Sequence, residues 1–128
     1  MDKIVSMNPQ KYCISLDLAK RLHELGVKKR SLFYWSNEDN EKEPWKIDFS
    51  GYAVSRNGVE VAHYPAYTSG ELGEMLPVGC FSRKSFDDDR WFIDMAGIDK
   101  FFYGDTEAEA RGLMLDYLIK NGFVTLEK

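Results

Sequence analysis

The stretch DTEAEARGLMLDYLIKNGFV, residues 105–124, is the strongest helix signal in the chain. Thr106 and Glu109 have the spacing of a capping box, acidic residues fill the first turns, and Asn121-Gly122 is a typical helix end. The apolar side chains cover more than one narrow stripe; they are Ala110, Met114, Tyr117 and Leu118, widened by Leu113 and Leu115. A helix with so broad an apolar surface is expected to pack against a sheet.

A second amphipathic helix is predicted within SLDLAKRLHELGV, residues 15–27. Leu18, Leu22 and Leu25 fall on one helical face, while charged residues occupy the others. Ser15 can cap the start of this helix, and Gly26 is the residue expected just past its end. The next segment, SLFYW at 31–35, is apolar and aromatic and is predicted to be a strand.

The clearest hairpin signal lies in GYAVSRNGVEVAHY, residues 51–64, because Asn57-Gly58 suits a two-residue type I′ turn. Such a turn pairs Arg56 with Val59. Extended along the strands, the same register pairs Val54 with Val61 and Tyr52 with His63.

A second hairpin is predicted within residues 80–97, turning around Asp87 to Asp89. In its second strand one face carries Trp91, Ile93 and Met95, and the other carries Phe92 and Asp94.

Between the two hairpins, TSGELGEMLP at 68–77 reads as a short helix. Thr68 and Glu71 have the spacing of a capping box, and Pro77 ends the segment. We favour a helix that covers a sheet over one at the mouth of a site. Gly70 and Gly73 leave open the alternative that a ligand or a partner backbone approaches this helix.

Length and composition predict one globular α+β domain over residues 1–128, with a mainly antiparallel sheet built from hairpins and packed by three helices in a sandwich-like arrangement. Seventeen basic and 21 acidic residues give a net charge of -4, which does not favour nucleic acid or anionic lipid as a partner. The chain shows no secretion signal and no apolar run long enough to span a membrane. We therefore expect a cytoplasmic protein that does not bind membranes.

No cofactor, metal or catalytic site is predicted. Cys13 and Cys80 belong to no metal-binding or redox motif. Asp87, Asp88 and Asp89 with Asp94 could offer oxygen ligands to a hard cation, but their spacing matches no known loop, and we favour a solvated hairpin tip. His63 beside Tyr52 is the one candidate general base, with an ordinary sheet residue as the favoured interpretation.

Three blocks of the chain resemble blocks that small uncharacterised phage and prophage proteins share in the same order. They are LDLAKRLHELGVKKRSLFYW (16–35), AYTSGELGEMLP (66–77) and DTEAEARGLMLDYLIKNG (105–122). The resemblance implies the phage α-β-α sandwich type, in which a sheet lies between helices, and a group with no established activity. It implies no site residue for this chain.

We therefore expect a phage-type accessory protein that acts by binding a macromolecule rather than by catalysis. The chain has three tryptophans, seven tyrosines and eight phenylalanines, so some rings should remain exposed. The predicted contact residues are Tyr34, Trp35, Phe102 and Tyr103, and the partner is an unknown protein or a second copy in a homodimer. The alternative is a nucleic-acid-binding module that uses the basic-aromatic segment 28–35, with Lys28, Lys29 and Arg30 on the phosphates. A small enzyme with a site centred on His63 is the third possibility.

Overall fold

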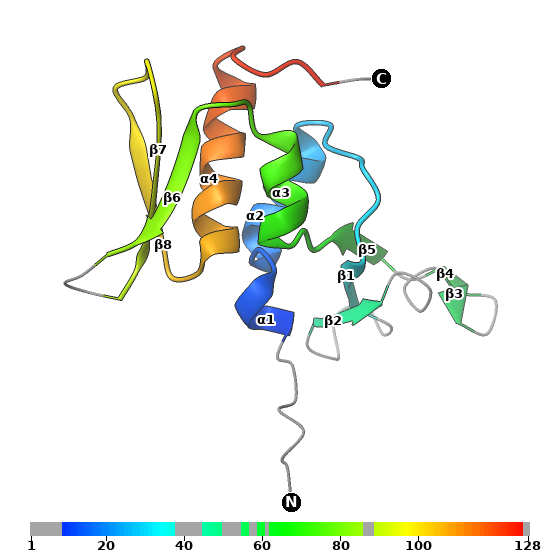
Figure 1. Cartoon of the computed structure of the whole chain (residues 1–128). Helices are drawn as coiled ribbons and strands as arrows, with labels where there is room; N and C mark the ends of the chain where they lie inside the picture. Colours follow the sequence, from blue (N-terminus) through cyan, green and yellow to red (C-terminus); the bar gives the residue numbers. More distant parts are fainter. Residues whose placement is uncertain are drawn as a thin grey trace, which may run out of the picture.

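The computed structural model describes residues 9–37, 45–49, 55–56, 59–60, 62–85 and 89–126. Its helices are α1 (Pro9–Tyr12), α2 (Leu16–Glu24), α3 (Ser69–Met75) and α4 (Glu107–Lys120). Its strands are β1 (Phe33–Asn37), β2 (Lys46–Phe49), β3 (Ser55–Arg56), β4 (Val59–Glu60), β5 (Ala62–Pro65), β6 (Cys80–Lys84), β7 (Trp91–Met95) and β8 (Phe101–Gly104). Figure 1 shows α4 between the β6–β7–β8 sheet on one side and α2 and α3 on the other.

Helix α4 is central because it contributes to two separate clusters of buried side chains. Ala110, Met114 and Leu118 pack against Ile93 and its neighbours in the β6–β7–β8 sheet. Ala108 and Leu115 join the cluster formed with α2, α3 and the segments beside them. The expectation that this broad apolar helix packs against a sheet is confirmed, and the second covering layer explains why its apolar surface exceeds one stripe.

Glycine at position 112 allows α2 to come close to α4. A methyl group built on Gly112 would lie 2.5 Å from Leu18 Cδ2 and 2.9 Å from Ile14 Cγ2. A side chain here would therefore force the two elements apart.

The β6–β7–β8 sheet is an antiparallel meander in which consecutive strands are neighbours. The predicted second hairpin is confirmed, with Lys84 paired to Trp91 and Cys80 to Met95. Asp89, in the predicted turn, has a φ of 61°, and its carboxylate lies 3.1 Å from Lys84 Nζ. Asp87 and Asp88 lie outside the described residues.

The other three-stranded sheet has the order β2–β1–β5, also antiparallel. β3 and β4 form a short ladder in which Arg56 pairs with Val59, as the Asn57-Gly58 turn predicts. The turn residues themselves and the predicted partners Val54, Val61 and Tyr52 lie outside the described residues. The backbone of His63 belongs to β5, where it pairs with Ser36 of β1.

At α2 and α3 the N-terminal caps form as the sequence predicts. At α4 only one of the two predicted capping-box hydrogen bonds forms. Ser15 Oγ accepts from Leu18 N–H, and both bonds of the Thr68–Glu71 capping box are present. Thr106 Oγ accepts from Glu109 N–H, but the Glu109 carboxylate does not complete a capping box. It accepts instead from Ser15 N–H and Ser15 Oγ–H, each at 2.8 Å, because the start of α2 lies beside the first turn of α4.

Helix α3 packs mainly against α4 rather than covering a sheet, which corrects the sequence expectation. Its Glu71 carboxylate accepts from Ser31 Oγ–H at 2.7 Å and from Leu32 N–H at 3.0 Å, so the helix also fixes the approach to β1. A methyl group on Gly73 would lie 2.7 Å from Arg111 Nη1. This glycine makes room for a side chain of α4, and the alternative of ligand access is not needed to explain it.

The predicted α+β class, with antiparallel strands and hairpins packed by helices, is confirmed. The observed order of layers differs in one respect from the sandwich that the resemblance implies. In the described part of the chain the element between layers is the helix α4, whereas the resemblance implies a sheet between helices. The reason is that α4 is buried on both sides, while the strands divide into separate small sheets.

Candidate binding surface

The outer face of the β6–β7–β8 sheet, turned away from α4, carries two cross-strand rows of side chains. The register places Phe81, Asp94 and Phe101 in one row. It places Arg83, Phe92 and Tyr103 in the next. Because directly paired residues project from the same side of a sheet, all six side chains lie on one face. We call these six residues the outer aromatic face.

The rings of this face are large and accessible to solvent. Phe81 is 63% exposed, Phe101 55% and Tyr103 39%, while Phe92 is half-buried among them. The ring centroids of Phe92 and Phe101 are 5.3 Å apart, as are those of Phe92 and Tyr103. On the opposite face Ile93 is buried against α4, and Trp91, Met95 and Phe102 are partly buried in the same cluster. Exposed apolar area concentrated in this way is typical of an interaction surface.

Two guanidinium groups lie on the rings. Arg83 Cζ is 4.8 Å from the centroid of Phe92, and Arg90 Cζ is 4.5 Å from that of Tyr103. These cation–π contacts hold both arginines over the sheet. Arginine together with aromatic residues is the composition enriched in the centres of protein interfaces.

The four predicted contact residues do not form one patch. Trp35 is a core residue, 9% exposed, and its Nε1–H donates to the Ile14 carbonyl at 2.9 Å, so its expected place on a surface is wrong. Phe102 packs on the inner side of its sheet against Tyr117. Tyr34 is half-buried on β1, in the other sheet. Tyr103 alone belongs to the outer aromatic face.

The sequence contains a signal that would have found this face. Phe101 and Tyr103 alternate with Phe102, and the hairpin register sets Phe92 and Asp94 apart from Ile93. Combining the two alternations requires the pairing of β7 with β8. Gly97 indicates a turn between these strands but does not by itself specify their register.

The basic residues of the nucleic-acid alternative are exposed, whereas the aromatic residues of the same segment are buried or half-buried. Lys28, Lys29 and Arg30 lie in the coil after α2. Of the three rings in that segment, Trp35 is buried and Phe33 and Tyr34 are half-buried, so the area open to base stacking is reduced. Lys28 and Lys29 instead border a groove of about 870 Å³ with apolar walls that include Met75 and Leu126.

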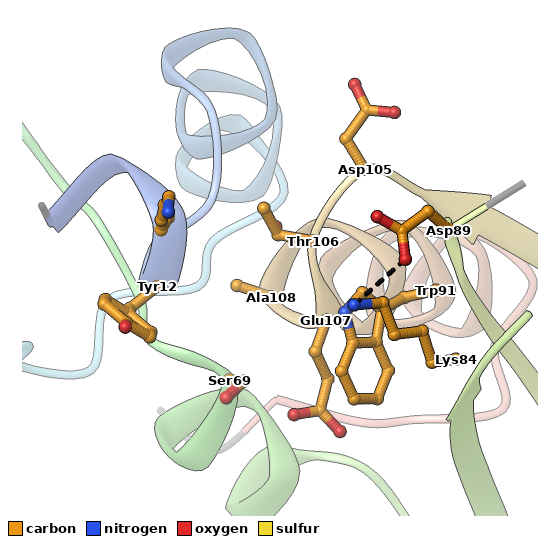
Figure 2. Close-up of a pocket in the computed structure, with 10 residues that line it drawn as sticks. Tyr12, Ser69, Lys84, Asp89, Trp91, Asp105, Thr106, Glu107 and Ala108 are labelled. Carbon is orange, nitrogen blue, oxygen red and sulfur yellow. Dashed lines mark ion pairs between the residues drawn. The ribbon is translucent and has the colours of Figure 1, made fainter.

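A smaller cavity of about 400 Å³ lies where α1, the start of α3, the start of α4 and the β6–β7 hairpin meet. Figure 2 shows Tyr12, Ser69 and Thr106 on one side of it, with Trp91 and the ion-paired Lys84 and Asp89 on the other. The lining mixes lysines with aspartate and glutamate side chains, so it offers no concentrated charge of one sign to a ligand.

Neither a metal centre nor a reactive thiol is evident in the described residues. No group of three or more histidine, cysteine or acidic side chains there could hold a metal ion. Burial raises the pKa of the Cys13 thiol from 9.0 to about 12, assisted by the negative charge of Glu71. Burial likewise raises the pKa of Cys80, and Asp94 adds to the effect. Both thiols are free and lack the thiolate character of a nucleophile.

The side chain of His63 lies outside the described residues, as does Tyr52, so the site centred on His63 stays a prediction. His23 is exposed on α2 and meets Tyr64 edge to face, with ring centroids 5.3 Å apart. No helix among the described residues has the length and apolar character needed to cross a membrane.

Comparison of the chain with protein-family models, with curated proteins and with solved structures gave no match. The surface itself is therefore the basis on which a function can be assigned.

Proposed function

We propose that this protein acts by binding another macromolecule through the outer aromatic face. The observation that carries the proposal is the exposure of Phe81, Phe101 and Tyr103 on one side of a sheet whose other side is buried against α4. Three accessible rings on β6 and β8, the two strands that flank β7, supply apolar contact area at a low cost in side-chain entropy.

A macromolecule suits this surface better than a small molecule. The rings stand on a three-stranded sheet, and the cavities described above are lined by other residues. Small ligands are usually enclosed in concave pockets, whereas protein interfaces are broad and centred on aromatic and arginine side chains. The setting in a phage-type accessory system stays a prediction from the three sequence blocks.

A photo-crosslinking residue placed at position 101 tests the proposal in cells that express the full chain. We expect a discrete covalent adduct at position 101, which mass spectrometry identifies. The matched control places the same residue at position 123, because Phe123 is 57% exposed but follows α4 rather than lying on the sheet. Arg83→Ser and Phe92→Ser, each combined with the probe at 101, should reduce the adduct.

Equal adducts at 101 and 123, or no adduct at 101, would overturn the proposed function. Digestion of the adduct with protease or nuclease then identifies the class of macromolecule. A nuclease-sensitive adduct at 101 would transfer the nucleic-acid alternative to this face, where the rings are exposed.

A further inference from the structure

The groove bounded by the ends of α2 and α3 and by the segment after α4 has aliphatic walls. Its volume is about 870 Å³, which lies within the range of small-molecule sites. Val27 and Leu115 are almost completely buried and form its floor, while the other apolar lining residues are partly buried. These others are Leu25, Met75, Val124 and Leu126. None of the residues that line the groove belongs to the outer aromatic face, so the groove is a separate candidate site.

Two exposed lysines lie beside this groove, in the coil that follows α2. The backbone that carries them is held on both sides. Val27 N–H donates to the Leu22 carbonyl at 3.0 Å, and the hydroxyl of the buried Tyr67 donates to the Lys29 carbonyl at 2.7 Å. In the described part of the chain neither Lys28 nor Lys29 forms an ion pair. Both ammonium groups are therefore available to a ligand at the rim of the groove.

Negative charge near the groove does not cancel the charge of the two lysines. Among the described residues that line it, Glu74 is the only acidic one. The ends of α2 and α3 would add the negative poles of helix dipoles, which arise from carbonyls without a donor. The carbonyls of Leu22, His23 and Leu72 already accept from backbone N–H groups, which weakens those poles. The rim is therefore positive, although the net charge of the chain is -4.

The polar and apolar parts of the lining are separated. Lys28, Lys29, Glu74 and Thr125 are all exposed, whereas every apolar side chain of the lining is buried or partly buried. A ligand that fits this division is polar at one end only. No aromatic ring is found among the described lining residues, so a nucleobase or another planar ligand would have no ring on which to stack.

We propose that this groove binds a long aliphatic chain that ends in a carboxylate, such as a fatty acid. The aliphatic walls contact the chain, and the two lysines at the rim bind the carboxylate. A cationic head group would meet two lysines and one glutamate, and is therefore disfavoured. This site goes beyond the proposed function, with which it shares no residue.

Titration of the full chain with decanoate, below the critical micelle concentration of the ligand, tests the site by calorimetry. We expect a one-to-one complex with a dissociation constant in the micromolar range. Lys28→Gln/Lys29→Gln should weaken binding by about 10-fold, because two solvent-exposed ion pairs are lost. The matched control is Lys11→Gln/Lys46→Gln, which removes two exposed lysines of α1 and β2 that do not line the groove and should bind decanoate like the parent.

The charge of the ligand gives the sharpest comparison. Decanol has the same chain without the charge, and we expect the parent to bind it about 10-fold more weakly than decanoate. Lys28→Glu/Lys29→Glu should reverse the preference, so that this variant binds decyltrimethylammonium and no longer binds decanoate. A purely structural role of the two lysines would instead weaken all three ligands equally. Circular dichroism checks that every variant is folded.

Methyl NMR locates the ligand on the protein. Decanoate should shift the ε-methyl signal of Met75, which is assigned with Met75→Leu, more than that of Met95 on β7. Thr125→Trp places a large side chain at an exposed position of the lining and should weaken binding of both decanoate and decanol. Binding to the exposed rings of the outer aromatic face would leave Met75 unchanged and would overturn the inference.

The inference also fails if decanoate does not bind, if decanol binds as well as decanoate, or if Lys28→Gln/Lys29→Gln binds like the parent. A Met75 signal that changes with protein concentration in the absence of ligand would reject the fatty acid and assign the groove to a second copy. Co-sedimentation with phosphatidylglycerol vesicles that requires the two lysines would reject the free acid in favour of a membrane surface. None of these results decides the proposed function, which the adduct at position 101 tests separately.

Discussion

The bond pair between Glu109 and Ser15 gives the clearest test of how the fold is held together. The Glu109 carboxylate accepts from both the backbone N–H and the hydroxyl of Ser15, 94 positions away in the chain. Ser15 in turn caps α2 through Leu18 N–H. We predict that Glu109→Ala destabilises the whole domain, because it leaves the start of α2 without the acceptor supplied by α4.

The magnitude follows from the bonds that are lost. A hydrogen bond to a charged group contributes about 1.5–3 kcal/mol, and an acidic residue in the first turn of a helix adds about 0.3–1 kcal/mol. Both donors are only half-buried and regain water in the variant, so the losses are not additive. We expect the free energy of unfolding to fall by about 2–3 kcal/mol, equivalent to a decrease of about 10 °C in Tm for a chain of this size.

Urea denaturation followed by tryptophan fluorescence measures this change, since Trp35 is buried in the native state. Glu74→Ala is the matched control, because Glu74 is an exposed carboxylate on α3 and its loss should cost less than about 0.5 kcal/mol. A double-mutant cycle with Ser15→Ala should give a coupling energy of about 1 kcal/mol for the hydroxyl bond. The reasoning fails if Glu109→Ala is as stable as the control or if the coupling is zero.

Two further predictions concern glycine and cysteine. Gly70→Ala should stabilise the domain by about 0.5–1 kcal/mol through helix propensity, because its new methyl group meets nothing nearer than 3.9 Å. Gly73→Ala should lose that gain or destabilise, because the methyl group displaces Arg111 from the Ser69 carbonyl, to which Arg111 Nη1 donates at 2.7 Å; equal effects of the two variants in thermal unfolding would contradict the packing. Burial raises the pKa of Cys13 from 9.0 to about 12, so the folded state holds this proton more tightly than the unfolded chain. The resulting stability is complete below pH 9 and disappears as the pH rises toward 12, and unfolding free energies measured over that window should fall less steeply for Cys13→Ala than for the parent.

Local signals in the sequence predicted the elements well because the relevant partners are only a few residues apart. Ser15, Thr68 and Thr106 each accept from a backbone N–H three residues later, as their spacing predicts. The hairpin within residues 80–97 follows from the turn around Asp87 to Asp89 and from the alternation of Trp91, Ile93 and Met95 with Phe92 and Asp94 in its second strand. Such interactions are determined before any tertiary contact forms.

The connections between elements could not be predicted, because each depends on which helices become neighbours. Glu109 has a local partner within reach but binds Ser15, and Glu71 binds both its own cap and Ser31. Asp116 is buried on α4 and paired with Arg21 of α2, although its neighbours in the sequence give no sign that a carboxylate belongs inside. Its Oδ1 has no hydrogen-bond partner among the described residues.

The sequence predicts that aromatic rings are exposed, but it does not predict which rings they are. Exposed aromatic rings were expected from composition, and Tyr103 is one of them. The aromatic runs that contain Trp35 and Phe102 predict rings on the surface, yet adjacent residues of a strand project to opposite sides. Which residue of FFY at 101–103 turns inward is decided by α4, whose Met114 and Leu118 cover the side that bears Phe102.

The stability of the domain and the binding proposed for the outer aromatic face should be separable. Phe81 and Phe101 remain more than half exposed in the folded chain, so they gain little from folding and are not required to hold β6 and β8 in place. The inner residues of the same strands, Ser82 and Phe102, already link the sheet to α4, the serine through its hydroxyl donating to Glu107 at 2.7 Å. Large rings that contribute so little to folding carry a cost in solubility. A bound partner removes that cost, which is the physical argument for reading this face as the working surface of the protein.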